Sequence, residues 1–135
     1  MGSLYPSRVR LILVRHAEAA PGQPDELRPL TPAGRATARR LAERVGGLHP
    51  DAVLSSPLLR ARETAAEIAQ VAGVELEPDE RLAPGATVDD IRELVEGRGE
   101  TVVVVCHQPD CGAIVAALTG NEPRFPPGAA YEVEL

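Results

Sequence analysis

Short apolar runs alternate along the chain with segments in which apolar residues recur every three or four positions. The runs lie at 10–14, 51–54 and 101–106, and each one stops at polar residues. Apolar runs of this length predict short buried strands. The run at 101–106 holds four consecutive valines and is the strongest of these predictions, while 74–76 predicts a further strand.

The periodic segments between the runs predict four helices. Thr31 before Pro32 has the form of an N-cap followed by proline at the first helical position, and Gly46 ends this first helix. The segment 55–57 predicts the start of the second helix in the same way, and 87–90 has the form of a capping box. The expected buried faces are Ala38, Leu41, Ala42, Val45 and Leu48; Leu58, Ala61, Ala65, Ile68 and Ala72; Val88, Ile91, Leu94 and Val95; and Cys111, Ile114, Val115 and Leu118.

Residues 130–135 alternate between apolar and acidic side chains, which predicts an edge strand. Strands that alternate with helices predict an α/β three-layer sandwich, with a mostly parallel central sheet flanked by helices. We find no repeat or interdomain linker, and 135 residues is a common length for one domain. We therefore expect a single domain over 1–135, with residues 1–7 as a flexible N-terminus.

Composition excludes several classes of function. The net charge of −6 and the near absence of aromatic residues argue against nucleic acid as a partner. All 14 basic residues are arginine, so Schiff-base chemistry and the lysine-dependent phosphate loop are excluded. Two cysteines make no disulfide framework, and no segment resembles a signal peptide or a membrane span. We expect a cytoplasmic protein without a membrane partner, metal or cofactor.

Chemically reactive side chains follow three of the predicted strands. Arg15 and His16 follow the first strand, Arg60 and Arg62 lie soon after the second, and His107 follows the strand at 101–106. In a parallel sheet these three sites share one edge, beside helix N-termini that favour anions. A neutral imidazole can attack phosphorus while guanidinium groups neutralise phosphoryl oxygens. The third histidine, His49, lies in a Gly- and Pro-containing loop and is expected at the surface.

At this point the chain resembles a known family. It is similar to the histidine phosphatase superfamily, which includes phosphoglycerate mutases and acid phosphatases, and most of all to the small SixA-type phosphohistidine phosphatases. The resemblance spans about residues 9–120 and rests on VRHAE (14–18), Asp25 with RPLT (28–31) and Gly34, SSPLLRARETA (55–65) and VVCHQP (104–109). It implies a phosphoglycerate mutase-like fold and a cofactor-independent phosphatase.

The resemblance also implies roles for individual residues. His16 is the expected nucleophile, which forms a phosphohistidine intermediate, while Arg15, Arg60 and His107 bind and polarise the phosphoryl group. Periodicity alone does not separate Arg60 from Arg62, since both lie off the apolar stripe of their helix; the family motif favours Arg60. Two further candidates for substrate contact are Glu18 and Arg28.

The chain departs from the family pattern at the general acid. Relatives carry a glutamate after the second helix or an acid directly after the second histidine, but Pro84 and Gln108 occupy these places. Loss of the acid costs about 10²- to 10⁴-fold when the leaving group is an alkoxide. A phosphohistidine nitrogen leaves readily once protonated, so the missing acid favours a phosphohistidine protein as substrate. The alternative is that another acid takes its place, and the candidates are Glu18, Asp79, Glu80 and Asp89.

Other functions fit the sequence less well. A cysteine phosphatase needs arginine six residues after the cysteine, but Gly112 follows Cys106 at that spacing and Ala117 follows Cys111. A metal site at these cysteines is disfavoured because both suit small buried positions. The main rival is a phosphatase for a small phosphorylated metabolite, and a more remote one is a non-catalytic phosphate-binding module.

Overall fold

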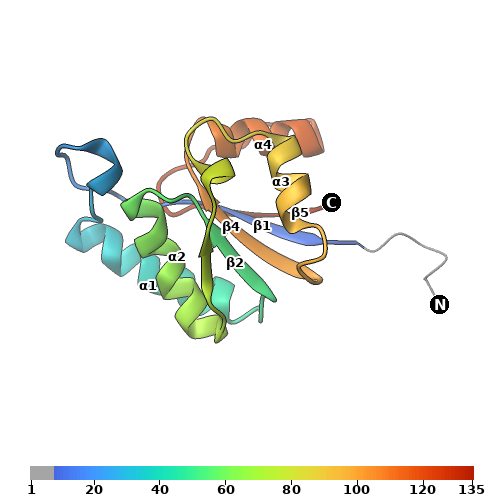
Figure 1. Ribbon diagram of the computed structural model, residues 1–135, viewed down its shortest axis with the longest axis horizontal. Helices are drawn as coiled ribbons and strands as arrows, with labels where there is room; N and C mark the ends of the chain where they lie inside the picture. Colours follow the sequence, from blue (N-terminus) through green and yellow to red (C-terminus); the bar gives the residue numbers. More distant parts are fainter. Residues whose placement is uncertain (1–7) are drawn as a thin grey trace.

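The computed structural model describes residues 8–135 as a twisted sheet with helices on both faces (Figure 1). The expected flexible N-terminus, residues 1–7, lies outside the described residues. The strands are β1 (Arg10–Arg15), β2 (Ala52–Ser55), β3 (Leu76–Pro78), β4 (Thr101–Cys106) and β5 (Ala130–Glu134). The helices are α1 (Pro32–Gly46), α2 (Leu59–Ala72), α3 (Val88–Val95) and α4 (Asp110–Thr119), with 3₁₀ turns η1 (Asp25–Leu27) and η2 (Glu80–Leu82).

The five described strands form one sheet in the order β3-β2-β4-β1-β5. Pairing is parallel from β3 through β1, and β5 runs antiparallel to β1 at the edge of the sheet. The predicted edge strand and the mostly parallel sheet are thus confirmed. The carboxyl ends of the parallel strands meet at one edge, where a ligand site is expected in folds of this kind.

Strand register sets the relative positions of the two candidate histidines. In the pairing of β1 with β4, Arg15 lies opposite Cys106. His16 and His107 follow these two residues directly, so both leave the sheet at the same level. The backbone N–H of His16 donates to the Cys106 carbonyl at 3.2 Å, which continues the ladder to this point.

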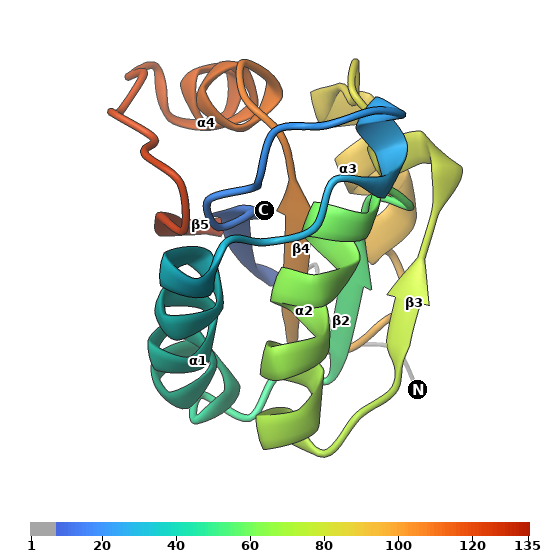
Figure 2. The same ribbon diagram turned by 90° about the vertical axis from the view of Figure 1, so that its left-hand side faces the viewer.

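Helices α1 and α2 cover one face of the sheet, and α3 and α4 cover the other (Figure 2). Successive residues of β1 point to opposite faces, as a strand requires. Leu11 and Leu13 pack in the core with α3 and α4, whereas Ile12 and Val14 pack in the core with α1 and α2. The sheet is buried on both sides, and the predicted three-layer sandwich is confirmed.

The helix caps hold the segments around the sheet edge. Thr31 Oγ1 accepts a hydrogen bond from the Gly34 N–H at 2.9 Å and caps α1 as predicted. A Cβ at position 34 would lie 2.2 Å from the Glu18 carbonyl oxygen, so only glycine allows α1 to approach this loop so closely. The predicted capping box of α3, formed by Thr87 and Asp90, is also present.

Three sequence predictions need correction. Helix α2 begins at Leu59, and its N-cap Leu58 makes no side-chain cap, because Ser55 ends the strand and Ser56 lies in the turn. Strand β3 begins at Leu76 rather than at residue 74. Leu48 is 44% exposed because α1 ends before it, so this residue does not belong to the core.

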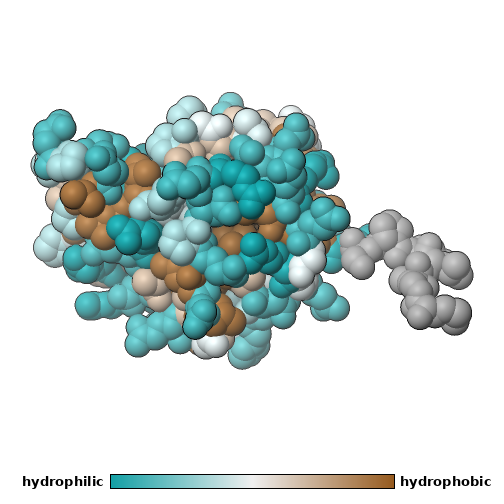
Figure 3. All heavy atoms as spheres, in the orientation of Figure 1, coloured by the Kyte–Doolittle hydropathy of each residue, from teal (hydrophilic) through white to brown (hydrophobic). Residues whose placement is uncertain are grey.

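Polar side chains cover most of the face shown in Figure 3, and the hydrophobic residues there form separate patches. Among residues 8–135, the large apolar side chains that remain exposed lie apart along the chain: Leu27 in η1, Leu48 after the end of α1, and Val71 in α2. Over residues 8–135, no helix has both the length and the hydropathy that crossing a membrane requires.

Candidate active site

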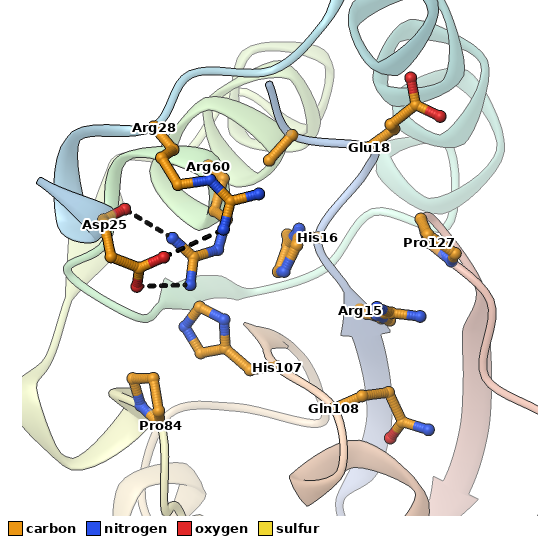
Figure 4. A pocket seen from close by; sticks show the side chains of 11 residues that line it. Arg15, His16, Glu18, Asp25, Arg28, Arg60, Pro84, His107, Gln108 and Pro127 are labelled. Carbon is orange, nitrogen blue, oxygen red and sulfur yellow. Dashed lines mark hydrogen bonds and ion pairs between the residues drawn. The ribbon is translucent and has the colours of Figure 1, made fainter. Parts of the chain in front are cut away.

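The four residues expected to act together line one pocket of about 540 Å³ at the carboxyl ends of β1, β2 and β4 (Figure 4). Arg15 ends β1, His16 follows it, Arg60 lies in the first turn of α2, and His107 follows β4. Figure 4 shows His16, His107 and Arg60 around a common space, with Arg15 beside them at the end of β1. The convergence predicted from the parallel sheet is therefore present in the fold.

A hydrogen bond to the backbone determines which ring nitrogen of His16 carries the proton and which carries the lone pair. Nδ1 lies 2.7 Å from the Ala17 carbonyl oxygen, which can only accept, so Nδ1 carries the proton and donates it. In the neutral ring, Nε2 is then unprotonated. The pKa of His16 is lowered to about 4, chiefly by burial and also by the neighbouring arginine charges, against the raising effect of the Ala17 hydrogen bond. The ring is neutral at pH 7 and available for nucleophilic attack.

His107 lies beside His16 at the base of the pocket. Its side chain is 3% exposed, and the two ring centroids are 5.1 Å apart in an edge-on arrangement. The pKa of His107 is lowered to about 4, chiefly by burial and also by the nearby His16 and Arg60. Both rings are therefore neutral at pH 7, and His107 can act as a hydrogen-bond donor without adding charge.

Arg60 is 7% exposed even though it lies off the apolar stripe of α2. Its guanidinium donates from Nη1 to the Asp25 carbonyl at 2.9 Å and from Nη2 to Asp25 Oδ2 at 3.2 Å. Arg62 instead donates from Nε to the Pro57 carbonyl at 2.8 Å and does not line the pocket. In the first turn of α2, Arg60 faces the pocket while the neighbouring Ala61 packs in the sheet core, which explains how a charged residue off the stripe becomes buried.

Arg15 is held from the opposite wall. Its Nη1 donates to the Phe125 carbonyl at 3.0 Å. Its Nε–H is buried without a hydrogen-bond partner, and no other buried side-chain nitrogen or oxygen in residues 8–135 is unpaired. An unpaired buried N–H is costly to the folded state.

The weaker candidates Arg28 and Glu18 also line the pocket. Arg28 donates from Nε to the Ala20 carbonyl at 2.8 Å and from Nη1 to Asp25 Oδ1 at 3.0 Å. Hydrogen bonds from Arg28 and Arg60 hold the pKa of Asp25 below its ordinary value. Glu18 accepts a hydrogen bond from Thr31 Oγ1 at 2.8 Å, which ties its carboxylate to the rim near α1.

The other acids considered as proton donors lie elsewhere. Asp79 accepts three hydrogen bonds from Arg81, and its pKa is lowered by them. Glu80 and Asp89 are not among the residues that line the pocket, whereas Pro84 and Gln108 are. Gln108 uses its Oε1 to accept from the Gly112 N–H at 2.7 Å. The acids that line the pocket are Glu18 and Asp25.

Sequence reasoning assigned no role to three features of the site. Asp25 was recognised as part of a motif, and its spacing of three residues from Arg28 could have indicated the ion pair. Phe125 contributes a backbone carbonyl and Pro127 part of the pocket wall, and neither carries a sequence signal. His49 is exposed, as predicted, and lies outside the site.

We expect the acid limb of kcat/KM to fall near pH 4 rather than near pH 6.5. At pH 5 a histidine with pKa of about 6.5 is about 3% neutral, whereas the lowered pKa of about 4 leaves His16 mostly neutral and nucleophilic. The measurement is kcat/KM from pH 3.5 to 8, corrected for ionisation of the substrate. Half-loss of activity near pH 6.5 would contradict this.

Circular dichroism at each pH provides the control, because the same pKa shift affects stability. The unfolded chain binds protons at an ordinary histidine pKa of about 6.5, before the buried rings do. The free energy of unfolding is therefore expected to fall as the pH drops from 6.5 toward 4.

Comparison with known proteins agrees with the geometry. The model of the histidine phosphatase superfamily (branch 1) matches residues 11–84. An uncharacterised protein of Picosynechococcus sp. is 37% identical over 130 residues, which cover 84% of this chain and 77% of that protein. The protein histidine phosphatase SixA, solved with tungstate, has a TM-score of 0.81 at 28% identity over 92% of this chain and 86% of that chain.

A mycobacterial glucosyl-3-phosphoglycerate phosphatase shares the fold, with a TM-score of 0.68 at 22% identity over 84% of this chain and 80% of its own. The family match covers more than half of the chain and includes three of the four converging residues: Arg15, His16 and Arg60. The chain belongs to the histidine phosphatase superfamily and is SixA-like within it.

Proposed function

We propose that this protein is a phosphatase that works through a phosphohistidine intermediate on His16 and that its substrates are proteins phosphorylated on histidine. The observation that carries the proposal is the position of a neutral His16, whose Nε2 lone pair is free, in one pocket with the guanidinium groups of Arg15 and Arg60. A nucleophile beside guanidinium groups in one pocket suits phosphoryl transfer.

In the first step, His16 Nε2 attacks phosphorus in line with the leaving group. The new N–P bond forms as the bond to the substrate breaks, and charge on the phosphoryl oxygens is stabilised by Arg15, Arg60 and His107. In the second step, water attacks the phosphohistidine, releases inorganic phosphate and returns His16 to its starting state. No metal or cofactor is needed for either step.

The acids in the pocket support phosphohistidine as the substrate. Asp25 is held ionised by Arg28 and Arg60, so it has no proton to give to a departing alkoxide. Glu18 is bound to Thr31 at the rim. An alkoxide needs a proton from an acid, whereas the imidazole of a phosphohistidine already carries one when it is ready to leave. The likeness to the protein histidine phosphatase SixA agrees with this substrate class.

A second candidate is a phosphatase for small phosphorylated metabolites. The pocket of about 540 Å³ has room beyond a phosphoryl group, and Arg28 and Gln108 on its wall could contact a polar metabolite. The third reading, a phosphate-binding module without turnover, leaves the free Nε2 of His16 unexplained.

The test compares substrates on the purified protein. Matched peptides carry phosphohistidine or phosphoserine at the same position, and p-nitrophenyl phosphate serves as a small ester. We expect kcat/KM for the phosphohistidine peptide to exceed that for the phosphoserine peptide by at least about 100-fold, the cost of a missing general acid. Peptide without enzyme corrects for spontaneous hydrolysis.

Two other results would contradict the proposal and favour a different function. Faster turnover of small esters than of the phosphohistidine peptide would favour the metabolite phosphatase. Binding of tungstate without hydrolysis of any substrate would favour the binding module.

A further inference from the structure

Ser56 is not among the residues that line the pocket, but it contacts one that does, His107. Ser56 follows β2, is 0% exposed, and its backbone N–H donates to the Val105 carbonyl of β4 at 2.9 Å. Its hydroxyl oxygen lies 2.7 Å from Nε2 of His107. Because the backbone bond links the two strand ends that carry Ser56 and His107, the two side chains are held in fixed relation.

Counting hydrogen bonds gives the direction of the Ser56 contact. Ser56 Oγ accepts from the Leu58 N–H at 3.2 Å, which uses one of its lone pairs. Within residues 8–135, the remaining partner of this buried hydroxyl is His107 Nε2, the sole acceptor for its proton. The alternative, in which Nε2–H donates to Oγ, would leave a buried hydroxyl proton without an acceptor, which is costly.

This direction determines the tautomer of His107. If Nε2 accepts from the hydroxyl, the proton of the neutral ring must be on Nδ1. His107 lines the pocket, and its Nδ1 has no hydrogen-bond partner among the described residues. Nδ1–H can then donate to a phosphoryl oxygen. The opposite tautomer would present a lone pair to that oxygen and repel it.

We propose that Ser56 is a positioning residue that holds His107 in the Nδ1–H tautomer, so that a neutral imidazole donates to the transferring phosphoryl group. The part that concerns phosphoryl transfer rests on the proposed function, but the tautomer itself does not. The low pKa of His107 agrees with a neutral ring at pH 7. The site thus gains a fixed donor, and His107 adds no further positive charge beside Arg15 and Arg60.

The direct test is the long-range ¹H–¹⁵N correlation spectrum of the wild-type protein at pH 7, which distinguishes protonated from unprotonated ring nitrogens. We expect His107 to carry its proton on Nδ1. A His107 ring protonated on Nε2 overturns the proposal. This measurement needs neither turnover nor a variant, so it stands even if the proposed phosphatase activity is absent.

Ser56→Ala provides the kinetic arm, with Ser55→Ala as the matched control. Ser55 is equally buried, but its hydroxyl donates to the Ser56 carbonyl and does not contact His107. We expect Ser56→Ala to shift His107 toward the Nε2–H form and to lower kcat by about 10- to 100-fold with little change in KM, since a donor lost here acts mainly in the transition state.

Ser55→Ala is expected to keep the Nδ1–H tautomer and nearly all of kcat. Equal effects of the two variants on kcat, with an unchanged His107 spectrum in both, would contradict a role for Ser56 in positioning. If Ser56→Ala does not fold, the wild-type spectrum decides the question alone.

Discussion

Replacing His16 with alanine (His16→Ala) is expected to reduce turnover of every substrate by at least about 10⁴-fold, as the loss of a covalent nucleophile does in other enzymes. No other unprotonated nitrogen in the pocket is placed to substitute for it: the hydrogen bond from Ser56 occupies Nε2 of His107, and guanidinium groups are always protonated. Steady-state rates with the phosphohistidine peptide and p-nitrophenyl phosphate measure the loss.

The same variant is expected to keep its fold and to bind tungstate, because Arg15, Arg60 and His107 remain. His49→Asn is the matched control, since His49 is exposed, and asparagine tolerates its positive φ of 55°. Rapid quenching of the wild-type protein with ³²P-labelled substrate is expected to trap acid-labile label on His16. Turnover that survives in His16→Ala, or label on another residue, would overturn the covalent mechanism.

Arg60→Ala is expected to lower kcat/KM by about 10²- to 10³-fold, comparable to the loss of a preorganised donor in other active sites. The guanidinium places a positive charge at the pocket wall, and its removal also frees the Asp25 carboxylate from one of its two arginine partners. The remaining negative charge would repel an incoming phosphoryl group. Steady-state kinetics and tungstate affinity measure the effect.

Arg62→Ala is the matched control for Arg60→Ala. Arg62 lies two residues further along α2 and bonds to the Pro57 carbonyl outside the pocket. Its loss is expected to change kcat/KM by less than about threefold. Arg60→Lys is expected to recover part of the activity, since lysine restores the charge but not the planar pair of donors. Equal losses in Arg60→Ala and Arg62→Ala would refute the assignment.

The elements that carry the site could be predicted because their signals are local. The valines of β4 and the Thr31 cap of α1 specify their elements by pattern alone, and parallel pairing then brings His16 and His107 to one edge. The sequence could not reveal the burial of Arg60. Helical periodicity indicates which face of a helix packs on the sheet, but it does not indicate which residues line a pocket at the end of the helix.

Contacts made through the backbone or between distant segments were also beyond the sequence. The carbonyl of Phe125 that holds Arg15 is independent of the side chain at that position. Ser56 was interpreted as part of a helix cap, because a serine before proline has that form, yet its hydroxyl bonds to His107, 51 residues away. Such partners depend on how strands pair, which no local pattern encodes.

The register of β1 against β4 constrains where insertions and deletions in the chain are compatible with an intact site. One residue added to either strand before its histidine would displace that ring by about 3.3 Å along the strand and turn it to the opposite face of the sheet. The pairing of Arg15 with Cys106 would then no longer bring the two imidazoles together. We expect length variation among descendants of this chain to accumulate in surface loops such as the one between α3 and β4, and both strands to keep their length as long as activity is selected.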